Sequence, residues 1–249
     1  MVLSIDLTGR VALVTGGTRG IGLGITRALV AAGATVVTCS RSEVEPVPGT
    51  THRVCDVRDP EAVRALVGSL DRLDILVNNA GGAPATDAAT ASPRFHEKIV
   101  GLNLLAPLVC AQAANAVMQQ QETGGTIVNI SSISANRPAP TIAAYGAAKA
   151  GLDSLTTSLA MEWAPQVRVN AIDVGLCRTE QTDDHYGDDA SVAAIESTIP
   201  IGRMARPEEV GNVAAFLASD LASYVSGATV ACHGGGETPA FLLVQKGLT

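Results

Sequence analysis

Short apolar runs alternate with longer stretches of helical pattern along most of the chain. Within each run the apolar residues stand on consecutive positions, a pattern typical of parallel strands that helices cover on both faces. The runs that predict strands are Val11–Val14, Thr35–Thr38, Thr51–Cys55, Asp74–Val77, Thr126–Ile130, Val167–Ala171 and Ala228–Ala231.

Helices are predicted in the intervals between these strands. Gly33 follows the first helical pattern as a C-terminal glycine should. The predicted segments are Gly20–Ala32, a helix from Pro60, Leu102–Gln121, Ala143–Ala164 and a helix from Pro207. Seven strands with helical crossovers predict an α/β fold, with one doubly wound (Rossmann) parallel sheet in a single domain over residues 1–249.

One interval breaks the alternation. Residues 176–203 are polar and acidic, and a segment of this length between a strand and a helix is commonly a functional loop or lid. We therefore expect a long substrate loop there, mobile until a ligand binds. Its carboxylates would repel a strongly anionic substrate unless they point outward, and they are Glu180, Asp183, Asp184, Asp188 and Asp189.

Composition narrows the class of protein. The 249 residues are 47% hydrophobic and 16% charged, which is too apolar for a disordered chain. A net charge of −7 without a long basic run argues against nucleic acid as a partner. The five cysteines stand at least 16 residues apart, so we expect reduced, buried thiols in the cytoplasm and no metal site.

Targeting signals are not expected. The first residues have neither the basic nor the apolar region of a secretory signal. The uncharged stretch Ile99–Gln121 contains Asn103, Pro107 and Asn115, so a buried helix is expected in place of a membrane span.

Three glycines, Gly16, Gly20 and Gly22, stand between the first predicted strand and the first helix. Such a turn lets a pyrophosphate approach a helix N-terminus, where free N–H groups and the helix dipole favour anions. A P-loop would need Gly-Lys-Ser/Thr, but Leu23 follows Gly22. The placement predicts dinucleotide binding, and the alternative is a plain structural turn.

Tyr145 and Lys149 stand four positions apart on a predicted helix, so both side chains lie on one face. A neighbouring cation favours phenolate, and we expect it to lower the pKa of Tyr145 and make this residue a general acid/base. The alternative is a surface tyrosine beside a solvated lysine.

Polar residues follow two of the predicted strands. Asn129–Ser132 and Asn78–Gly81 each come at the carboxyl end of an apolar run, where parallel sheets bind ligands. The alternatives are an ordinary strand-to-loop transition and an asparagine-rich turn.

Two other chemistries are excluded. The chain has no Gly-x-Ser-x-Gly motif, which an α/β hydrolase requires. His96-Glu97 resembles the start of a zinc-protease motif, but Val100 stands where the second histidine is needed. We expect His52, His96, His185 and His233 to be surface or loop residues and not ligands.

Taken together, these residues resemble the classical short-chain dehydrogenase/reductase family over about residues 8–236. Thr15–Gly22 matches the family's cofactor motif, and Asn79-Ala80-Gly81 matches its central sheet motif. Further matches are Asp56, Gly202-Arg203, Pro207-Glu208-Glu209 and Ser226-Gly227. Val174 and His233 depart from the family pattern, since they stand where it usually has a proline and an aspartate.

The resemblance implies roles for particular residues. Ser132, Tyr145 and Lys149 would form the catalytic triad, and Asn103 would be the fourth member, which positions a helix kink and a water. Asp56 would bind the adenine ring. The implied cofactor-binding residues are Gly16, Thr18, Arg19, Gly20, Ile21, Gly22, Ser40, Arg41, Asp56, Val57, Asn79, Ala80, Gly81, Tyr145, Lys149, Gly175 and Thr179.

The end of the second strand predicts the choice of cofactor. Members of the family that prefer NAD usually have an acidic residue there, whereas this chain has Ser40 followed by Arg41. An arginine fork binds a 2′-phosphate through charge-assisted hydrogen bonds, and Arg19 is placed to help. We expect NADP(H) to be preferred with NAD(H) possible; the alternative is that both arginines extend into solvent.

The implied function is an oxidoreductase that interconverts a small-molecule ketone and a secondary alcohol. Two alternatives stay open: a 3-oxoacyl-thioester reductase, and a cofactor-sensing protein without turnover. The resemblance also implies a cytoplasmic homotetramer that pairs through the helices at Leu102–Gln121 and Ala143–Ala164.

Overall fold

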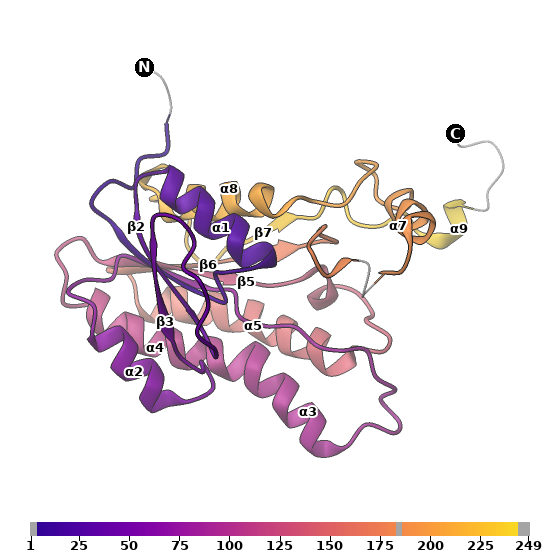
Figure 1. Ribbon diagram of the computed structural model, residues 1–249, viewed down its shortest axis with the longest axis horizontal. Coiled ribbons are helices and arrows are strands. Elements are labelled where there is room, and N and C mark those ends of the chain that lie inside the picture. The colour runs from indigo at the N-terminus through magenta and orange to yellow at the C-terminus, as the bar shows by residue number, and fades with distance from the viewer. Residues whose placement is uncertain (1–3, 183–185, 244–249) are drawn as a thin grey trace.

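A parallel sheet of seven strands, in the order β3-β2-β1-β4-β5-β6-β7, crosses the computed structural model, which describes residues 4–182 and 186–243 (Figure 1). The strands are β1 Val11–Thr15, β2 Thr35–Ser40, β3 Thr50–Val54, β4 Ile75–Asn78, β5 Gly125–Ile130, β6 Val167–Val174 and β7 Thr229–Cys232. Every predicted strand is present, and the predicted fold class is confirmed.

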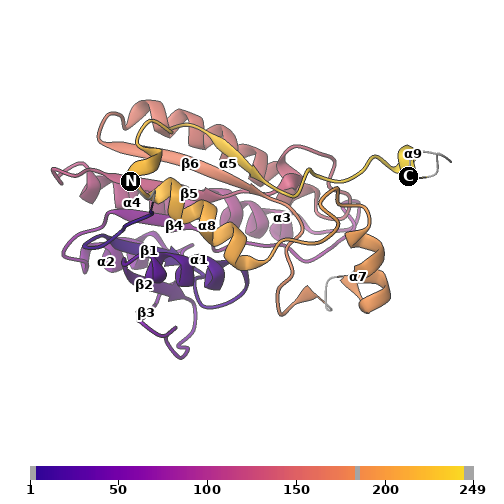
Figure 2. The ribbon, with the colours of Figure 1, turned by 90° about the horizontal axis from the view of Figure 1, so that it is seen from above.

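Helices cover both faces of this sheet. In Figures 1 and 2, α1 and α8 lie on one face, and α2, α4 and α5 lie on the other. Their bounds are α1 Gly20–Ala31, α2 Pro60–Gly68, α4 Ala106–Met118, α5 Ala143–Glu162 and α8 Pro207–Ala218. A separate apolar cluster fills each layer, as the continuous apolar strands predict.

Two glycines let α1 and α8 cross closely. A Cβ on Gly24 would lie 2.2 Å from the carbonyl carbon of Pro207, and one on Gly211 would lie 2.5 Å from the Gly24 oxygen. Only glycine fits at such a backbone approach. This contact fixes α1 on the sheet, with its N-terminus at the carboxyl end of β1.

The helix predicted to begin at Leu102 begins earlier, so that boundary was wrong. The helical stretch starts with α3 (Pro93–Val100), passes through a π-helical turn (η1, Gly101–Leu105) and continues as α4. Ser92 caps it by accepting a hydrogen bond from the backbone N–H of Phe95. The start of this helix at Pro93 was missed because the charged residues of α3 give no apolar pattern.

By length and composition, the stretch Pro93–Met118 could cross a membrane, although 39% of its apolar window is buried inside the protein. Core helices pass the same test.

The segment 176–203 was predicted to be a long loop, but part of it is helical: it contains α7 (Asp189–Glu196). Asp188 caps this helix, and Val192 packs with Ile199 and Met204 in a small apolar cluster. Asp183 and Asp184 lie outside the described residues. Figure 2 shows α7 at the same end of the molecule as α9 (Ala240–Leu243).

All five cysteines are free thiols, and four of them are buried as expected, while Cys232 is half-buried. The expectation for His52 was wrong. It lies on β3, is buried, and its Nδ1 is 3.0 Å from the Thr38 hydroxyl oxygen. His185 lies outside the described residues.

Candidate active site

The predicted site residues meet at the carboxyl edge of the sheet. The strand order reverses between β1 and β4, and an open parallel sheet binds its ligand at this switch point. The glycine turn follows β1, Asn79 follows β4, Ser132 follows β5 and Gly175 follows β6. Motifs that are distant in sequence therefore lie side by side.

The glycine turn and the Asn79 motif form one hydrogen-bonded unit. The Asn79 side-chain amide donates to the carbonyls of Thr15 (2.9 Å) and Gly16 (3.1 Å). The backbone N–H groups of Asn79 and Ala80 both donate to the Thr15 hydroxyl at 3.0 Å. Thr15 thus links the ends of β1 and β4.

The glycines of this turn form a cradle at the start of α1. Gly16 has a φ of +63°, which favours glycine, and a Cβ on Gly22 would lie 2.1 Å from the Gly16 oxygen. At the start of α1 the Gly20 N–H donates to the Glu180 carboxylate. A glycine cradle at a helix N-terminus whose N–H already binds a carboxylate fits a dinucleotide phosphate.

The residues predicted to bind adenosine lie at the ends of β2 and β3. Arg41 is exposed, whereas the Ser40 hydroxyl donates to the Ser42 carbonyl at 2.8 Å. Asp56 accepts two hydrogen bonds from the Arg58 guanidinium, at 2.6 and 3.0 Å, and this pairing lowers the pKa of Asp56. Arg58 was not predicted, and its only signal in the sequence is its place two residues after Asp56.

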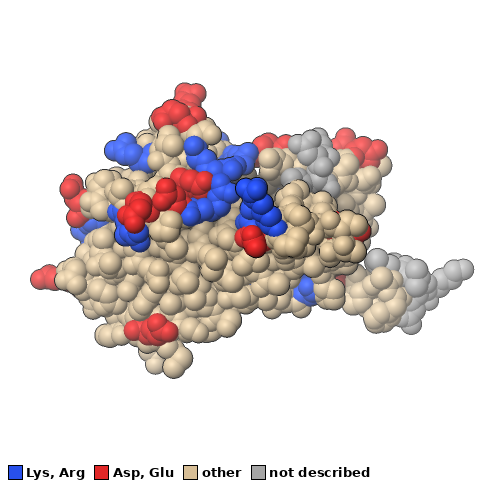
Figure 3. Space-filling view, turned by 90° about the horizontal axis from the view of Figure 1, so that it is seen from below, with Lys and Arg blue, Asp and Glu red and all other residues tan. Residues whose placement is uncertain are grey.

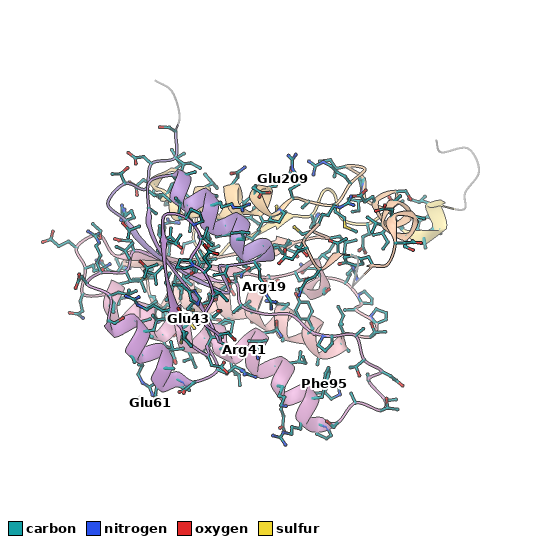
Figure 4. The ribbon with its side chains drawn as sticks, in the orientation of Figure 1. Arg19, Arg41, Glu43, Glu61, Phe95 and Glu209 are labelled. Carbon is teal, nitrogen blue, oxygen red and sulfur yellow. The ribbon has the colours of Figure 1, made fainter. Side chains whose placement is uncertain are left out.

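The positive charges of this region are grouped. In Figure 4, Arg19 beside α1 and Arg41 beyond β2 lie in the same part of the molecule. On the face in Figure 3, several Lys and Arg side chains form a group near the upper middle with Asp and Glu side chains next to it, and others stand apart. Arg19, like Arg41, is exposed. Both arginines are therefore accessible to an anionic ligand.

The two hydroxyl groups of the predicted triad interact. The Ser132 oxygen accepts a hydrogen bond from the Ser134 N–H at 3.2 Å, so its own O–H can donate to the phenol oxygen of Tyr145. A hydrogen bond between Ser132 and Tyr145 lowers the pKa of the phenol, but burial raises it by more. The net pKa of Tyr145 is raised above its ordinary value of 10.

This direction corrects the expectation that Lys149 lowers the pKa of Tyr145. The Lys149 ammonium lies 5.6 Å from the centre of the phenol ring and donates to the Ile130 carbonyl at 2.7 Å. Lys149 is itself only 3% exposed, and burial lowers its pKa to about 8. Burial is the largest cause of both shifts: it raises the pKa of Tyr145, and it lowers the pKa of Lys149 against the opposite effect of Asp153.

Asn103 fixes the backbone beside the site through hydrogen bonds of its side chain. It lies in the π-helical turn and is fully buried. Its Oδ1 accepts from the Gly82 N–H (2.9 Å), and its Nδ2 donates to the carbonyls of Gly82 (3.0 Å) and Ile99 (2.9 Å). A Cβ on Gly81 would lie 2.7 Å from Asn103 Oδ1 and 3.5 Å from Lys149 Nζ. All four predicted catalytic residues are therefore brought together.

A small recess beside Tyr145 was not predicted. It is lined mainly by apolar side chains, among them Pro84, Phe95 and Ile142. Thr141 borders it with a φ of +67°, a strained conformation for a β-branched residue, and its carbonyl accepts from the Thr86 N–H at 2.8 Å. No sequence signal marks this backbone conformation.

Gly175 follows β6, and Thr179, four residues later, lies near Gly20 of the glycine turn. A Cβ on Gly175 would lie 2.7 Å from the His233 Cα, so this position requires glycine. Val174, in place of the usual proline, is the last residue of β6 and pairs with Cys232. A Cβ on Gly20 would lie 3.6 Å from Thr179 Cγ2. Among residues 4–182 and 186–243, no cluster of His, Cys, Asp and Glu could hold a metal.

Comparisons with known proteins agree with this geometry. Residues 16–237 match the family model described as enoyl-(acyl carrier protein) reductase. The chain is 36% identical to 3alpha-hydroxysteroid dehydrogenase of Mediterraneibacter gnavus, over 92% of this chain and 97% of that protein. It is also 36% identical to 3-oxoacyl-(acyl-carrier-protein) reductase FabG of Rickettsia conorii, over 93% and 98%. The Pseudomonas aeruginosa RhlG/NADP active-site complex matches with a TM-score of 0.86 at 30% identity, over 94% and 99%.

Proposed function

Because the chain belongs to the classical short-chain dehydrogenase/reductase family and is an oxidoreductase, we propose that it interconverts a ketone and a secondary alcohol with NADP(H). The observation that carries this proposal is the meeting of Ser132, Tyr145 and the buried Lys149 beside the glycine cradle. A protein that only senses a cofactor has no need of this set, which counts against the non-catalytic alternative.

The side chains have distinct tasks in this proposal. The nicotinamide, when bound, supplies or accepts the hydride. In the reducing direction Tyr145 donates its proton to the carbonyl oxygen, and Ser132 donates a hydrogen bond that orients this oxygen. Lys149 holds positive charge next to the phenol, and Asn103 fixes the backbone around Gly82. Gly16, Gly20 and Gly22 admit the phosphates.

Replacing Tyr145 by Phe tests the mechanism. The ring keeps its packing but loses the transferable proton, so turnover should disappear while cofactor affinity stays within a few-fold. Turnover is measured by NADPH absorbance and affinity by calorimetry. Retention of most of the wild-type kcat would disprove the assigned role.

The preference for NADP(H) is proposed from Arg41 and Arg19. Both side chains are exposed on the adenosine side of the glycine turn, where a 2′-phosphate needs a cation. Arg41→Ala should cost about 1.5–3 kcal/mol of NADPH binding and leave NADH binding almost unchanged. Equal kcat/KM for NADPH and NADH in the wild type would refute the preference.

The substrate class follows from the surroundings of Tyr145. The neighbouring recess is mainly apolar, and the loop at 176–203 carries carboxylates, so we propose an uncharged carbonyl compound. The relatives named for hydroxysteroids and for 3-oxoacyl thioesters suggest two substrates to try, and the second keeps the reductase alternative open. A screen over ketones, sugars, steroids, quinones and 3-oxoacyl thioesters, read as NADPH oxidation, separates them.

We also propose a cytoplasmic homotetramer. Leu105 and Met161 are 52% and 84% exposed at the helices expected to pair, and an apolar side chain this exposed gains from contact with a second copy. Light scattering should show a species about four times the 25.4 kDa chain mass. A 25 kDa species at micromolar concentration would refute the assembly.

A further inference from the structure

Glu180 contacts the N-terminus of α1 from a distant part of the sequence. Its carboxylate accepts a hydrogen bond from the Gly20 backbone N–H, with 3.0 Å to Oε1 and 3.2 Å to Oε2. Gly20 begins α1 and is the middle glycine of the predicted cofactor motif. The carboxylate therefore lies where free N–H groups and the helix dipole favour an anion.

Within the described residues, α1 supplies no negative charge of its own at this end. Arg19 is its N-cap residue and makes no side-chain capping hydrogen bond, and the first turn holds no acidic residue. Glu180, 160 positions away, is the anion that this N-terminus receives in the structure.

The turn that presents Glu180 is anchored. The Thr182 hydroxyl accepts from the Thr179 N–H at 2.8 Å, and the Thr182 side chain is buried. Just before this turn, the Arg178 N–H donates to the Ala205 carbonyl at 2.8 Å. Glu180 is thus held opposite Gly20 by neighbours that are themselves fixed.

We propose that Glu180 occupies the place of a cofactor phosphate in the empty enzyme and has to leave before a dinucleotide binds, so that it sets cofactor affinity. This inference rests on the proposed dinucleotide site. A phosphate at the same N-terminus would compete for the Gly20 N–H and would be repelled by the carboxylate. An enzyme whose site is open for a fraction of the time loses affinity by that fraction.

The return of Glu180 to Gly20 would also favour cofactor release after the reaction. Product release limits the turnover of many enzymes. In this proposal the carboxylate lowers the affinity for the cofactor and thereby speeds replacement of the oxidised form by the reduced form.

Calorimetric titration of NADPH and NADH into the wild type, Glu180→Ala and Glu180→Gln tests the proposal. The alanine variant should bind both dinucleotides about tenfold more tightly. The glutamine variant should gain less, because its amide oxygen still accepts from Gly20. Glu97→Gln, an exposed position on α3, removes the same charge elsewhere and should leave both affinities unchanged.

The two cofactors and a smaller probe separate the explanations. NADPH and NADH share the pyrophosphate, so both should gain by the same factor, and inorganic pyrophosphate should also bind more tightly. A gain limited to NADPH would place the effect at the 2′-phosphate and overturn the proposal. If a Glu180 variant melts like the wild type but binds the dinucleotides equally or more weakly, Glu180 is only a helix cap and the proposal is refuted. If neither the wild type nor any variant bound NADPH or NADH, the proposed function would be refuted as well.

Discussion

Lys149 carries a charge that is costly to keep buried. Its side chain is 3% exposed, and burial lowers its pKa from 10.5 to about 8. That fall corresponds to about 3 kcal/mol of folding free energy lost while the group is protonated. Lys149→Met keeps an unbranched apolar stem and removes this cost, but it leaves the Ile130 carbonyl without its partner, which costs about 1–2 kcal/mol. We expect a net stabilisation of about 1–2 kcal/mol at pH 7.

The pH dependence has a defined sign. Below about pH 8 Lys149 is protonated in both the folded and the unfolded chain, so the wild type bears the whole cost. Between about 8 and 10.5 the folded chain releases this proton first, and the unfolded chain then binds more protons. Wild-type stability therefore rises relative to the methionine variant over this window, and the gain of the variant should disappear there.

Urea unfolding at pH 7 and pH 10, at one protein concentration, measures both quantities. Lys98→Met, at an exposed position on α3, is the matched control and should change stability by less than about 0.5 kcal/mol at either pH. The methionine variant at 149 should also lose turnover. A variant at 149 that is no more stable than the wild type at pH 7, or equally stabilised at pH 10, would refute the argument.

Three further substitutions, the first with a matched control, test the packing and the ion pairs. Gly211→Ala should destabilise by about 2–3 kcal/mol, because its Cβ would lie 2.5 Å from the Gly24 oxygen, whereas Gly68→Ala, with nothing within 4 Å, should be neutral or stabilising in the same melting assay. Asp74→Ala should cost about 1–3 kcal/mol in urea unfolding, since it leaves the Val11 N–H without its acceptor and removes the partner of the partly exposed Arg72. Glu209 is paired with Arg203, which lowers its pKa from 4.5 to about 2, so Glu209→Gln should lose stability at pH 7, and that loss should disappear as the pH falls toward 2.

The positions of the strands could be predicted because they depend mainly on which residues are buried. A parallel strand covered on both faces needs consecutive apolar residues, and each such run became a strand of the sheet. The start of the helix at Pro93 was missed because α3 is charged on its exposed side. Its helical state depends on the Ser92 cap and on packing of Ile99, and composition does not reveal either.

The site was predictable where spacing along one element decides the geometry. Tyr145 and Lys149 share a helix face, and the glycine motif lies between a strand and a helix. The contacts of Arg58 and Glu180 depend on side-chain directions in the folded chain, and no sequence pattern encodes them. The shift of the Tyr145 pKa failed as a prediction because desolvation depends on the whole surrounding core.

The protonation state of the site favours the acid role of Tyr145. Burial raises its pKa above 10, so the phenol holds its proton across the neutral range. Ser132 accepts a hydrogen bond from the Ser134 N–H, and its hydroxyl is paired with the Tyr145 phenol, so both hydroxyl groups lie at one place. Two hydroxyl donors set in advance match the negative charge that develops on a carbonyl oxygen during reduction. Alcohol oxidation needs the deprotonated phenol, so its rate should keep rising with pH beyond neutrality while the rate of reduction does not. Parallel pH profiles for the two directions would contradict this assignment.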